Sequence, residues 1–144
     1  PLADIITPNF FGADTLLERK IPHTKEGLIA ACRDLHKLGC PNVYLKGGRV
    51  EGTDEALDVL CNEKGDYELF EVPYVHTRNT HGTGCTLASS IAAGLAKGLS
   101  VEEAVKEAKE YVNGAVQASR FLHLGKGKQG PVNHLYRVFP CWKH

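Results

Sequence analysis

The sequence predicts an α/β fold, and three features of its 144 residues support this prediction. A short β-branched run, Ala3–Thr7, ends at a Pro-Asn pair that is typical of a turn. A helical pattern follows over residues 24–38, and Asn42–Gly48 then has the apolar character of a second buried strand. A strand, a helix and a second strand in this order favour parallel pairing in an open sheet.

The segment 24–38 has the start, face and end of an amphipathic helix. Thr24 is suited to the N-cap, and Gly39 follows the last turn as a stop. Four apolar residues share one face: Leu28, Ile29, Cys32 and Leu35. We therefore expect Cys32 to be a small core residue. Phe10–Arg19 is long enough for one or two helical turns.

The middle of the chain predicts a group of strands. Leu57–Cys61 and Tyr67–Val72 have the pattern of two strands separated by the turn 62–66. We therefore expect a hairpin in which Cys61 is buried and inert. Pro73–Arg78 is interpreted as one further strand, with His76 as an ordinary surface or strand residue.

Two consecutive helices are predicted in the last third. The first runs from about Gly82 to Lys97, is rich in small residues and ends at Gly98. Ser100 and Glu103 have the spacing of a capping box for a second helix that reaches about Phe121. The tail from Leu124 is loop-like, and no linker divides the chain. The strands are few for these apolar helices, so we expect a missing N-terminal portion or a partner chain to complete the sheet.

Composition excludes several classes of protein. The 17 basic and 17 acidic residues cancel, which argues against nucleic-acid or membrane-surface partners. No apolar run is long enough for a spanning helix, and no signal-peptide pattern opens the chain. The five cysteines form no C-x-x-C pair, which favours a reducing, cytoplasmic location over a zinc site or disulfide framework. The chain has no methionine, so we expect it to be part of something longer.

The strongest candidate site is the stretch Asn79-Thr80-His81-Gly82-Thr83-Gly84-Cys85-Thr86, which runs directly into a helix-forming segment. The first backbone N–H groups of a helix lack intrahelical partners and carry the positive end of its dipole, so they attract anions. Gly82 and Gly84 leave the backbone open to a ligand. Cys85 falls in the first turn, where a thiolate is favoured over a thiol. The stretch predicts an anion hole that contains a reactive side chain.

Other nucleotide and hydrolase motifs fit less well. Gly125-x-Gly127-x-x-Gly130 satisfies the dinucleotide fingerprint by letters, but it follows a helix and precedes Pro131, so we reject it. No P-loop or G-x-S-x-G window is present. His81 and Cys85 do not have the setting of a protease pair.

Two polar residues follow the predicted parallel strands. Asn9 comes just after the first strand and Lys46 stands at the end of the second, beside two glycines. Ligands gather at this edge of open α/β sheets, and a lysine there can reach a phosphate. Asn9 is equally well explained as a turn former, and Lys46 as a solvated lysine at a strand end.

The segment Thr77–Thr86, continued to Lys97-Gly98, resembles the signature of hydroxymethylpyrimidine/phosphomethylpyrimidine kinases, thiamin-pathway members of the ribokinase-like superfamily. Ile6-Thr7-Pro8-Asn9, Leu45-Lys46-Gly47-Gly48 and Gly130-Pro131-Val132-Asn133-His134 resemble the family in the same order. Most of the superfamily has an aspartate at the position of Cys85. A cysteine there is shared with some pyridoxal kinases.

The resemblance implies a fold, a reaction and a set of residue roles. The fold would be a three-layer α/β/α sandwich, of which residues 1–144 would be the C-terminal, nucleotide-binding half. The reaction would be ATP-dependent phosphorylation of a pyrimidine alcohol and its monophosphate. Gly82, Thr83 and Gly84 would hold the γ-phosphate, and Cys85 would be the general base. The remaining implied contacts are nucleotide binding by Lys46, Thr77 and Thr80, and Mg²⁺ binding by Asn9, through water.

Two departures from the family pattern limit this expectation. The family usually has an acidic residue three positions after Asn9, where it helps to place the metal. This chain has Gly12 there, and the nearest carboxylate, Asp14, could substitute if the loop shifts. Family kinase domains are about twice as long, and the missing half supplies the pyrimidine-binding residues. Two alternatives therefore stay open: a pyridoxal kinase with the same cysteine base, and a non-catalytic fragment that binds nucleotide or a partner. We expect the isolated chain to be inactive and the complete protein to be a homodimer.

Overall fold

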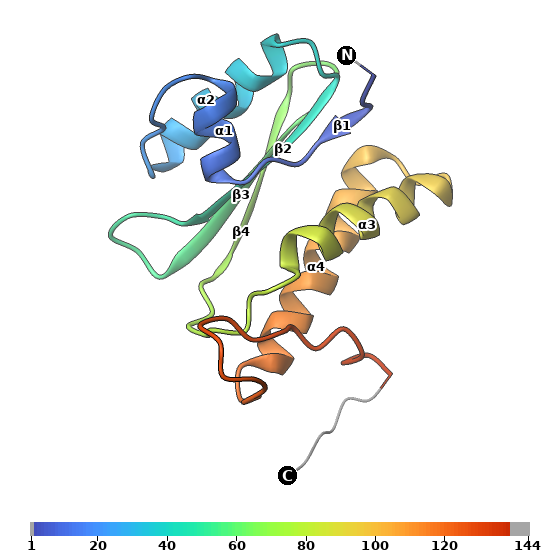
Figure 1. Cartoon of the computed structure of the whole chain (residues 1–144). Helices are drawn as coiled ribbons and strands as arrows, with labels where there is room; N and C mark the ends of the chain where they lie inside the picture. The colour runs from blue at the N-terminus through green and yellow to red at the C-terminus, as the bar shows by residue number, and fades with distance from the viewer. Residues whose placement is uncertain (1, 139–144) are drawn as a thin grey trace. The chain divides into compact units, whose positions relative to one another are not determined.

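The computed structural model describes residues 2–138 and contains a four-stranded sheet and four helices (Figure 1). The chain divides into two compact units, Pro1–Tyr74 and Val75–His144. The first unit contains every strand of the described chain, and the second contains the two long helices that follow the sheet in sequence.

The sheet of the first unit has the order β1-β2-β3-β4, with bounds Ile5–Ile6, Asn42–Arg49, Glu55–Cys61 and Tyr67–Pro73. β1 pairs with β2 in parallel, as the strand–helix–strand order predicted. The other two pairings are antiparallel and contiguous in sequence, which confirms the predicted hairpin. The sheet is therefore mixed, with its parallel pair at the edge that begins the chain.

Two helices cover one face of this sheet: α1, Phe10–Leu16, and α2, Lys25–Lys37. α2 begins where predicted, because Thr24 Oγ1 accepts the Gly27 N–H at 3.1 Å. Alternate residues of β2 and β3 face the helices, so the buried cluster has the period of a strand on one side and of a helix on the other. The largest of its fully buried side chains are those of Leu28, Leu35, Val43, Leu45, Leu57 and Val59.

The buried cysteines confirm the structural interpretation given to them. Cys32 and Cys61 belong to this core, and burial raises the pKa of Cys32 to about 12 and also raises that of Cys61. Cys40 is buried as well and donates to the Asn42 carbonyl at 3.2 Å. Cys85 is exposed, while Cys141 lies outside the described residues.

The prediction of a further strand over Pro73–Arg78 is wrong. Pro73 is the last residue of β4, and residues 74–78 form no strand. The proline has no N–H to continue a ladder. Tyr74 donates its own N–H to the Asp54 carbonyl, and the Arg78 carbonyl accepts from Gly130 in a loop. The segment thus finds scattered loop partners in place of a neighbouring strand.

The second unit is a pair of packed helices, α3, Thr83–Ala96, and α4, Val101–Ser119 (Figure 1). Small residues allow the close approach, because a Cβ at Gly94 would lie 2.9 Å from the Ala104 Cβ. The predicted capping box is confirmed: Ser100 Oγ accepts the Glu103 N–H at 3.2 Å, and Glu103 accepts the Ser100 N–H at 2.9 Å. Residues 2–138 include no helix long and apolar enough to cross a membrane.

Candidate active site

The predicted anion hole is the first turn of α3. Gly82 is the N-cap, and its φ of +91° lies in the left-handed region that side chains other than glycine adopt with strain. The Gly82 carbonyl accepts the first regular helical bond, from the Thr86 N–H at 2.9 Å. Gly82 carries no side chain to cap the helix. The free N–H groups of this turn are therefore left open to an external acceptor.

Within the described part of the chain, the backbone N–H groups of Gly82, Gly84 and Cys85 have no hydrogen-bond acceptor. The Thr83 N–H is engaged by the turn itself, since it donates to the Thr80 carbonyl at 3.3 Å, and the Thr83 hydroxyl donates to the same oxygen at 3.0 Å. The free donors are thus the two glycines and the cysteine. Cys85 itself is exposed and belongs to this first turn, so one residue carries both a free N–H group and an accessible thiol.

The loop before α3 is shaped by local hydrogen bonds. Thr77 Oγ1 accepts the Asn79 N–H at 3.1 Å, so this hydroxyl forms part of a turn. Thr80 contributes its carbonyl to Thr83. Both residues were predicted to line a nucleotide site. In this structure, each makes a local hydrogen bond that shapes the turn.

The glycine-rich loop 124–130 is bound to the same segment. The Arg78 guanidinium donates to the carbonyls of Leu124, Gly125 and Gly127 at 3.0–3.2 Å. The Gly130 N–H and carbonyl pair with the Arg78 carbonyl and the His81 N–H. No helix follows this loop among residues 2–138, so the helix that a dinucleotide fingerprint requires is not found there.

Asn79 anchors the loop from inside, a role that the sequence did not reveal. Its side chain is 1% exposed and donates to the carbonyls of Ser119 and Leu122 at the end of α4. Gly130 lies against Asn79 Oδ1, where a Cβ would collide with that oxygen. The asparagine that opens the motif therefore ties it to α4 and requires a glycine at position 130.

His134 is the second residue that sequence reasoning missed. Its Nε2 lies 2.8 Å from the Thr86 hydroxyl in the first turn of α3. The signal was present, because Gly130–His134 belongs to the resemblance, but the residues alone suggested no role for the histidine.

The first unit brings Asn9 and Lys46 together. The Lys46 N–H donates to the Pro8 carbonyl at 3.0 Å, and a parallel bridge joins Asn9 to Lys46. Asn9 is exposed, and its Oδ1 accepts the Gly12 N–H at 2.8 Å as the N-cap of α1. The turn-former interpretation of Asn9 is thus confirmed, while Oδ1 keeps a second lone pair. These two residues lie in a different unit from Gly82–Cys85.

A buried carboxylate fixes the backbone beside Lys46. Lys46 pairs across the ladder with Asp58, and the register then shifts by one residue before Arg49 pairs with Ala56. Asp58 is 6% exposed, and its two oxygens accept the Gly47 N–H at 3.1 Å and the Tyr44 hydroxyl at 2.8 Å. The bulge that follows Lys46 therefore has a charged internal support.

Comparison with known proteins adds to this geometry. A family model described as phosphomethylpyrimidine kinase matches residues 1–133. The chain belongs to the phosphomethylpyrimidine kinase family. This confirms the resemblance that the signature around Cys85 indicated.

Two curated relatives show how much of a family member the chain represents. It is 45% identical over 136 residues to a chloroplastic thiamine biosynthetic bifunctional enzyme of Arabidopsis thaliana, covering 94% of this chain and 26% of that protein. It is 40% identical over 145 residues to the hydroxymethylpyrimidine/phosphomethylpyrimidine kinase of Rhizobium meliloti, covering 99% of this chain and 52% of the relative. This family member therefore spans about half the length of its bacterial relative.

A solved structure supports the predicted fold. The ADP complex of Bacillus subtilis pyridoxal kinase is 35% identical and has a TM-score of 0.86, covering 96% of this chain and 51% of that one. The α/β fold of this phosphomethylpyrimidine kinase family member is therefore ribokinase-like, as predicted.

The acidic residue expected near Asn9 has no substitute in Asp14. Asp14 is buried, and its two oxygens accept from Lys20 Nζ and from the Ile21 N–H, each at 2.9 Å. Among residues 2–138, no group of three histidine, cysteine or acidic side chains could hold a metal ion. The exposed Asn9 Oδ1 has the chemistry to accept a hydrogen bond from the water shell that Mg²⁺ keeps when substrate phosphates bind it.

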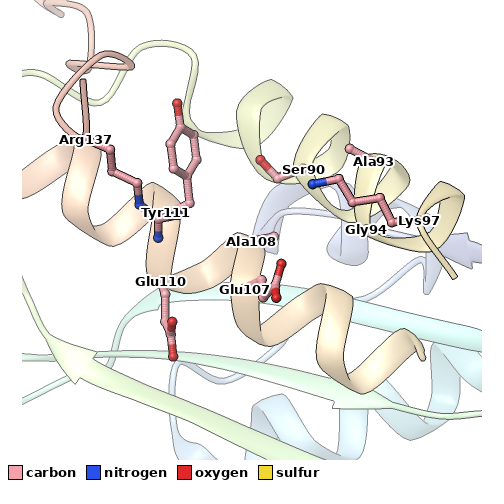
Figure 2. A pocket seen from close by; sticks show the side chains of 9 residues that line it. All are labelled: Ser90, Ala93, Gly94, Lys97, Glu107, Ala108, Glu110, Tyr111 and Arg137. Atoms are coloured by element: carbon pink, nitrogen blue, oxygen red, sulfur yellow. The ribbon is translucent and has the colours of Figure 1, made fainter. Parts of the chain in front are cut away.

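A separate groove of about 350 Å³ lies between α3 and α4 (Figure 2). Figure 2 shows Lys97, the C-cap of α3, extending toward Ser90, while Glu107 and Glu110 project from α4. The Arg137 guanidinium lies 5.3 Å from the centre of the Tyr111 ring. Charges of both signs line this groove, and none of the free N–H groups of Gly82, Gly84 and Cys85 opens into it. It is distinct from the predicted anion hole.

Proposed function

We propose that this chain is the C-terminal, nucleotide-binding half of a single kinase domain. The complete protein would transfer the γ-phosphoryl group of ATP to 4-amino-5-hydroxymethyl-2-methylpyrimidine and then to its monophosphate, in thiamin diphosphate biosynthesis. Family membership supports the reaction class, and the name of the Rhizobium meliloti relative supports the substrate.

The observation that carries this proposal is the first turn of α3. It combines free N–H groups on Gly82, Gly84 and Cys85 with an exposed thiol on the last of these residues. Donors that are fixed before the reaction stabilise negative charge as it develops, without reorganisation. A phosphoryl group held there would lie beside a side chain able to accept a proton.

Cys85 is the general base in this proposal. Its thiolate would take the proton from the primary hydroxyl of the substrate while the N–H groups bind the oxygens of the transferring phosphoryl group. Thr83 shapes the turn through Thr80, so its contribution to the anion hole comes through backbone geometry. Thr77 and Thr80 would border the nucleotide.

Lys46 would contact the nucleotide phosphates. The backbone after Lys46 is held by Asp58, which accepts the Gly47 N–H, and the ammonium group of Lys46 would supply the positive charge. The nucleotide itself is supported by the solved pyridoxal kinase, which was crystallised with ADP. Mg²⁺ would neutralise phosphate charge, and Asn9 would hold it through water.

A pyridoxal kinase is the second candidate. The Bacillus subtilis protein that resembles this chain in fold at 35% identity is named a pyridoxal kinase, which supports this candidate. A third candidate is a non-catalytic fragment that binds nucleotide or a partner, which the replacement of the family's acidic residue by Gly12 favours.

The remaining proposals follow from the fact that the chain covers only about half of its bacterial relative. The substrate pocket would come from an N-terminal half or a second chain, so the isolated 144 residues would be inactive. The complete protein would be a homodimer. All four cysteines of the described chain are free thiols, which suits a reducing compartment such as the cytoplasm.

The test is a substrate comparison with the complete protein that contains this chain. ATP and Mg²⁺ would be supplied with the pyrimidine alcohol, its monophosphate or pyridoxal, and the phosphorylated products measured. We expect turnover of both pyrimidines. Turnover of pyridoxal alone would select the second candidate, and ADP binding without any turnover would select the third.

A further inference from the structure

We propose that His134 is a positioning residue for the anion hole, acting through the hydroxyl of Thr86. The inference rests on the proposed function, since it concerns the same turn of α3. It starts from one short contact, the 2.8 Å between His134 Nε2 and Thr86 Oγ1.

The Thr86 hydroxyl has a single proton, and its use can be assigned. Thr86 Oγ1 also lies 2.7 Å from the Gly82 carbonyl oxygen. Two oxygens at this separation need a proton between them, and a carbonyl can only accept. The hydroxyl therefore donates to Gly82, so its remaining contact, with His134, must be one in which it accepts.

This assignment determines the tautomer of the histidine. Nε2 of His134 must carry a hydrogen, and Nδ1 is the nitrogen without a hydrogen in the neutral ring. The chain of donors then runs in one direction, from His134 to Thr86 and from Thr86 to Gly82. Each bond polarises the next in such a chain.

The chain ends on the residue that forms the anion hole. The Gly82 carbonyl accepts both the N–H and the hydroxyl of Thr86, so the two bonds together hold the left-handed N-cap. The His134 ring also lies over Gly82, with Cε1 3.9 Å from the position of an added Cβ. The turn has no side-chain cap of its own, and the contact from His134 stabilises it.

His134 is itself held by α4. Its carbonyl accepts the Tyr111 hydroxyl at 2.6 Å, and the preceding Asn133 N–H donates to the Ala115 carbonyl at 3.3 Å. The Tyr111 ring packs against Tyr136 with centroids 5.6 Å apart. The residue therefore connects α4 to the first turn of α3, and it can keep the Gly84 and Cys85 donors in a fixed direction.

The tautomer is tested on the chain itself, without reference to activity. Ring nitrogen-15 spectra of the wild type and of His134→Gln would identify the His134 signals. We expect a protonated Nε2 and an unprotonated Nδ1 in the neutral ring. The opposite tautomer would overturn the inference.

The positioning role is tested by kinetics in the complete protein. His134→Ala should lower kcat about tenfold, the factor of one ordinary hydrogen bond, while KM for ATP and the alcohol changes little. His134→Gln retains a side-chain N–H donor and should recover most of the loss. Thr86→Val should match His134→Ala, Thr86→Ser should be less affected, and the double variant His134→Ala/Thr86→Val should be no worse than either alone.

The control is His123→Ala, an exposed histidine in the loop after α4 whose ring contacts only the Phe121 carbonyl among the described residues. It should keep the wild-type kcat. Full kcat in His134→Ala, or no recovery by His134→Gln in a folded protein, would overturn the inference. Wild-type protein without kinase turnover would instead refute the proposed function, and the nitrogen-15 result would still decide the tautomer.

Discussion

The Tyr44 hydroxyl donates to Asp58 Oδ2 at 2.8 Å, and the other oxygen of the same carboxylate accepts the backbone N–H of Gly47. Both side chains are buried, Tyr44 completely. The bulge beside Lys46 is therefore built on a buried carboxylate to which Tyr44 and Gly47 both donate.

Tyr44→Phe removes the hydroxyl that donates to this buried carboxylate. We expect the free energy of unfolding to fall by about 1–3 kcal/mol, measured by urea denaturation at pH 7. Tyr67→Phe is the control, because Tyr67 is 44% exposed on β4. Equal stability of the two variants would contradict the role of the pair.

The same pair predicts a stability profile at alkaline pH. Burial, followed by the negative charge of Asp58, raises the pKa of Tyr44 in the folded protein. The unfolded tyrosine ionises near pH 10 while the folded one stays protonated, so stability is full below about pH 10 and falls as the pH rises above it. Tyr44→Phe should show a shallower decline, and an unchanged slope would contradict this.

Lys46→Gln tests the proposed phosphate contact. Removal of a charge-assisted hydrogen bond should weaken ADP binding by the chain, or raise KM for ATP in the complete protein, by about tenfold or more. Lys64→Gln, in the turn between β3 and β4, is the matched control. Unchanged ADP affinity in Lys46→Gln would favour the alternative interpretation, in which Lys46 is a solvated lysine at a strand end.

Cys85→Ala tests the general base. In the complete protein kcat should fall by about 10²–10⁴-fold, while ADP affinity stays within about twofold. An unchanged kcat would remove Cys85 as the general base. Among the four described cysteines, iodoacetamide should modify Cys85 first, because the other three are buried, and mass mapping of the adducts checks this order.

Gly130→Ala tests the contact between the glycine-rich loop and Asn79. The added Cβ would collide with Asn79 Oδ1, so we expect a loss of about 1–3 kcal/mol in unfolding free energy. Gly127→Ala, in the same loop, places its Cβ 3.7 Å from the nearest atom, the Gln129 carbonyl oxygen, and should change stability little. Denaturation of both variants under identical conditions decides the point.

Asp14→Asn separates a structural carboxylate from a metal ligand. The hydrogen bond from Lys20 holds the pKa of Asp14 below its usual range, although its burial acts in the opposite direction. This contribution to stability is present above about pH 4 and is lost as the pH falls through the lower, folded pKa. The variant should lose that acid dependence, whereas Asp4→Asn should keep it. A change in the Mg²⁺ requirement of the complete enzyme would contradict the structural role.

The sequence by itself determined the features that depend on neighbouring residues. Caps such as Thr24 and Ser100, the hairpin of β3 and β4, and the burial of Cys32 follow from spacing and local hydrogen bonding. The glycine-rich stretch before Cys85 likewise predicted a loop that runs into a helix, and α3 begins there at Thr83. The strand predicted over Pro73–Arg78 failed because a strand needs a neighbour, and no local pattern reveals that the neighbour is absent.

Tertiary structure alone decided how distant residues meet at the site. Asp58 reaches Gly47 across a hairpin, Asn79 reaches the end of α4, and His134 reaches Thr86 across 48 residues. Asp14, which the sequence offered as a substitute for the missing metal ligand, accepts hydrogen bonds from Lys20 and from the Ile21 N–H. The physical reason is that a buried polar group must find its partner wherever the fold brings one within hydrogen-bonding distance, and sequence separation does not record that distance.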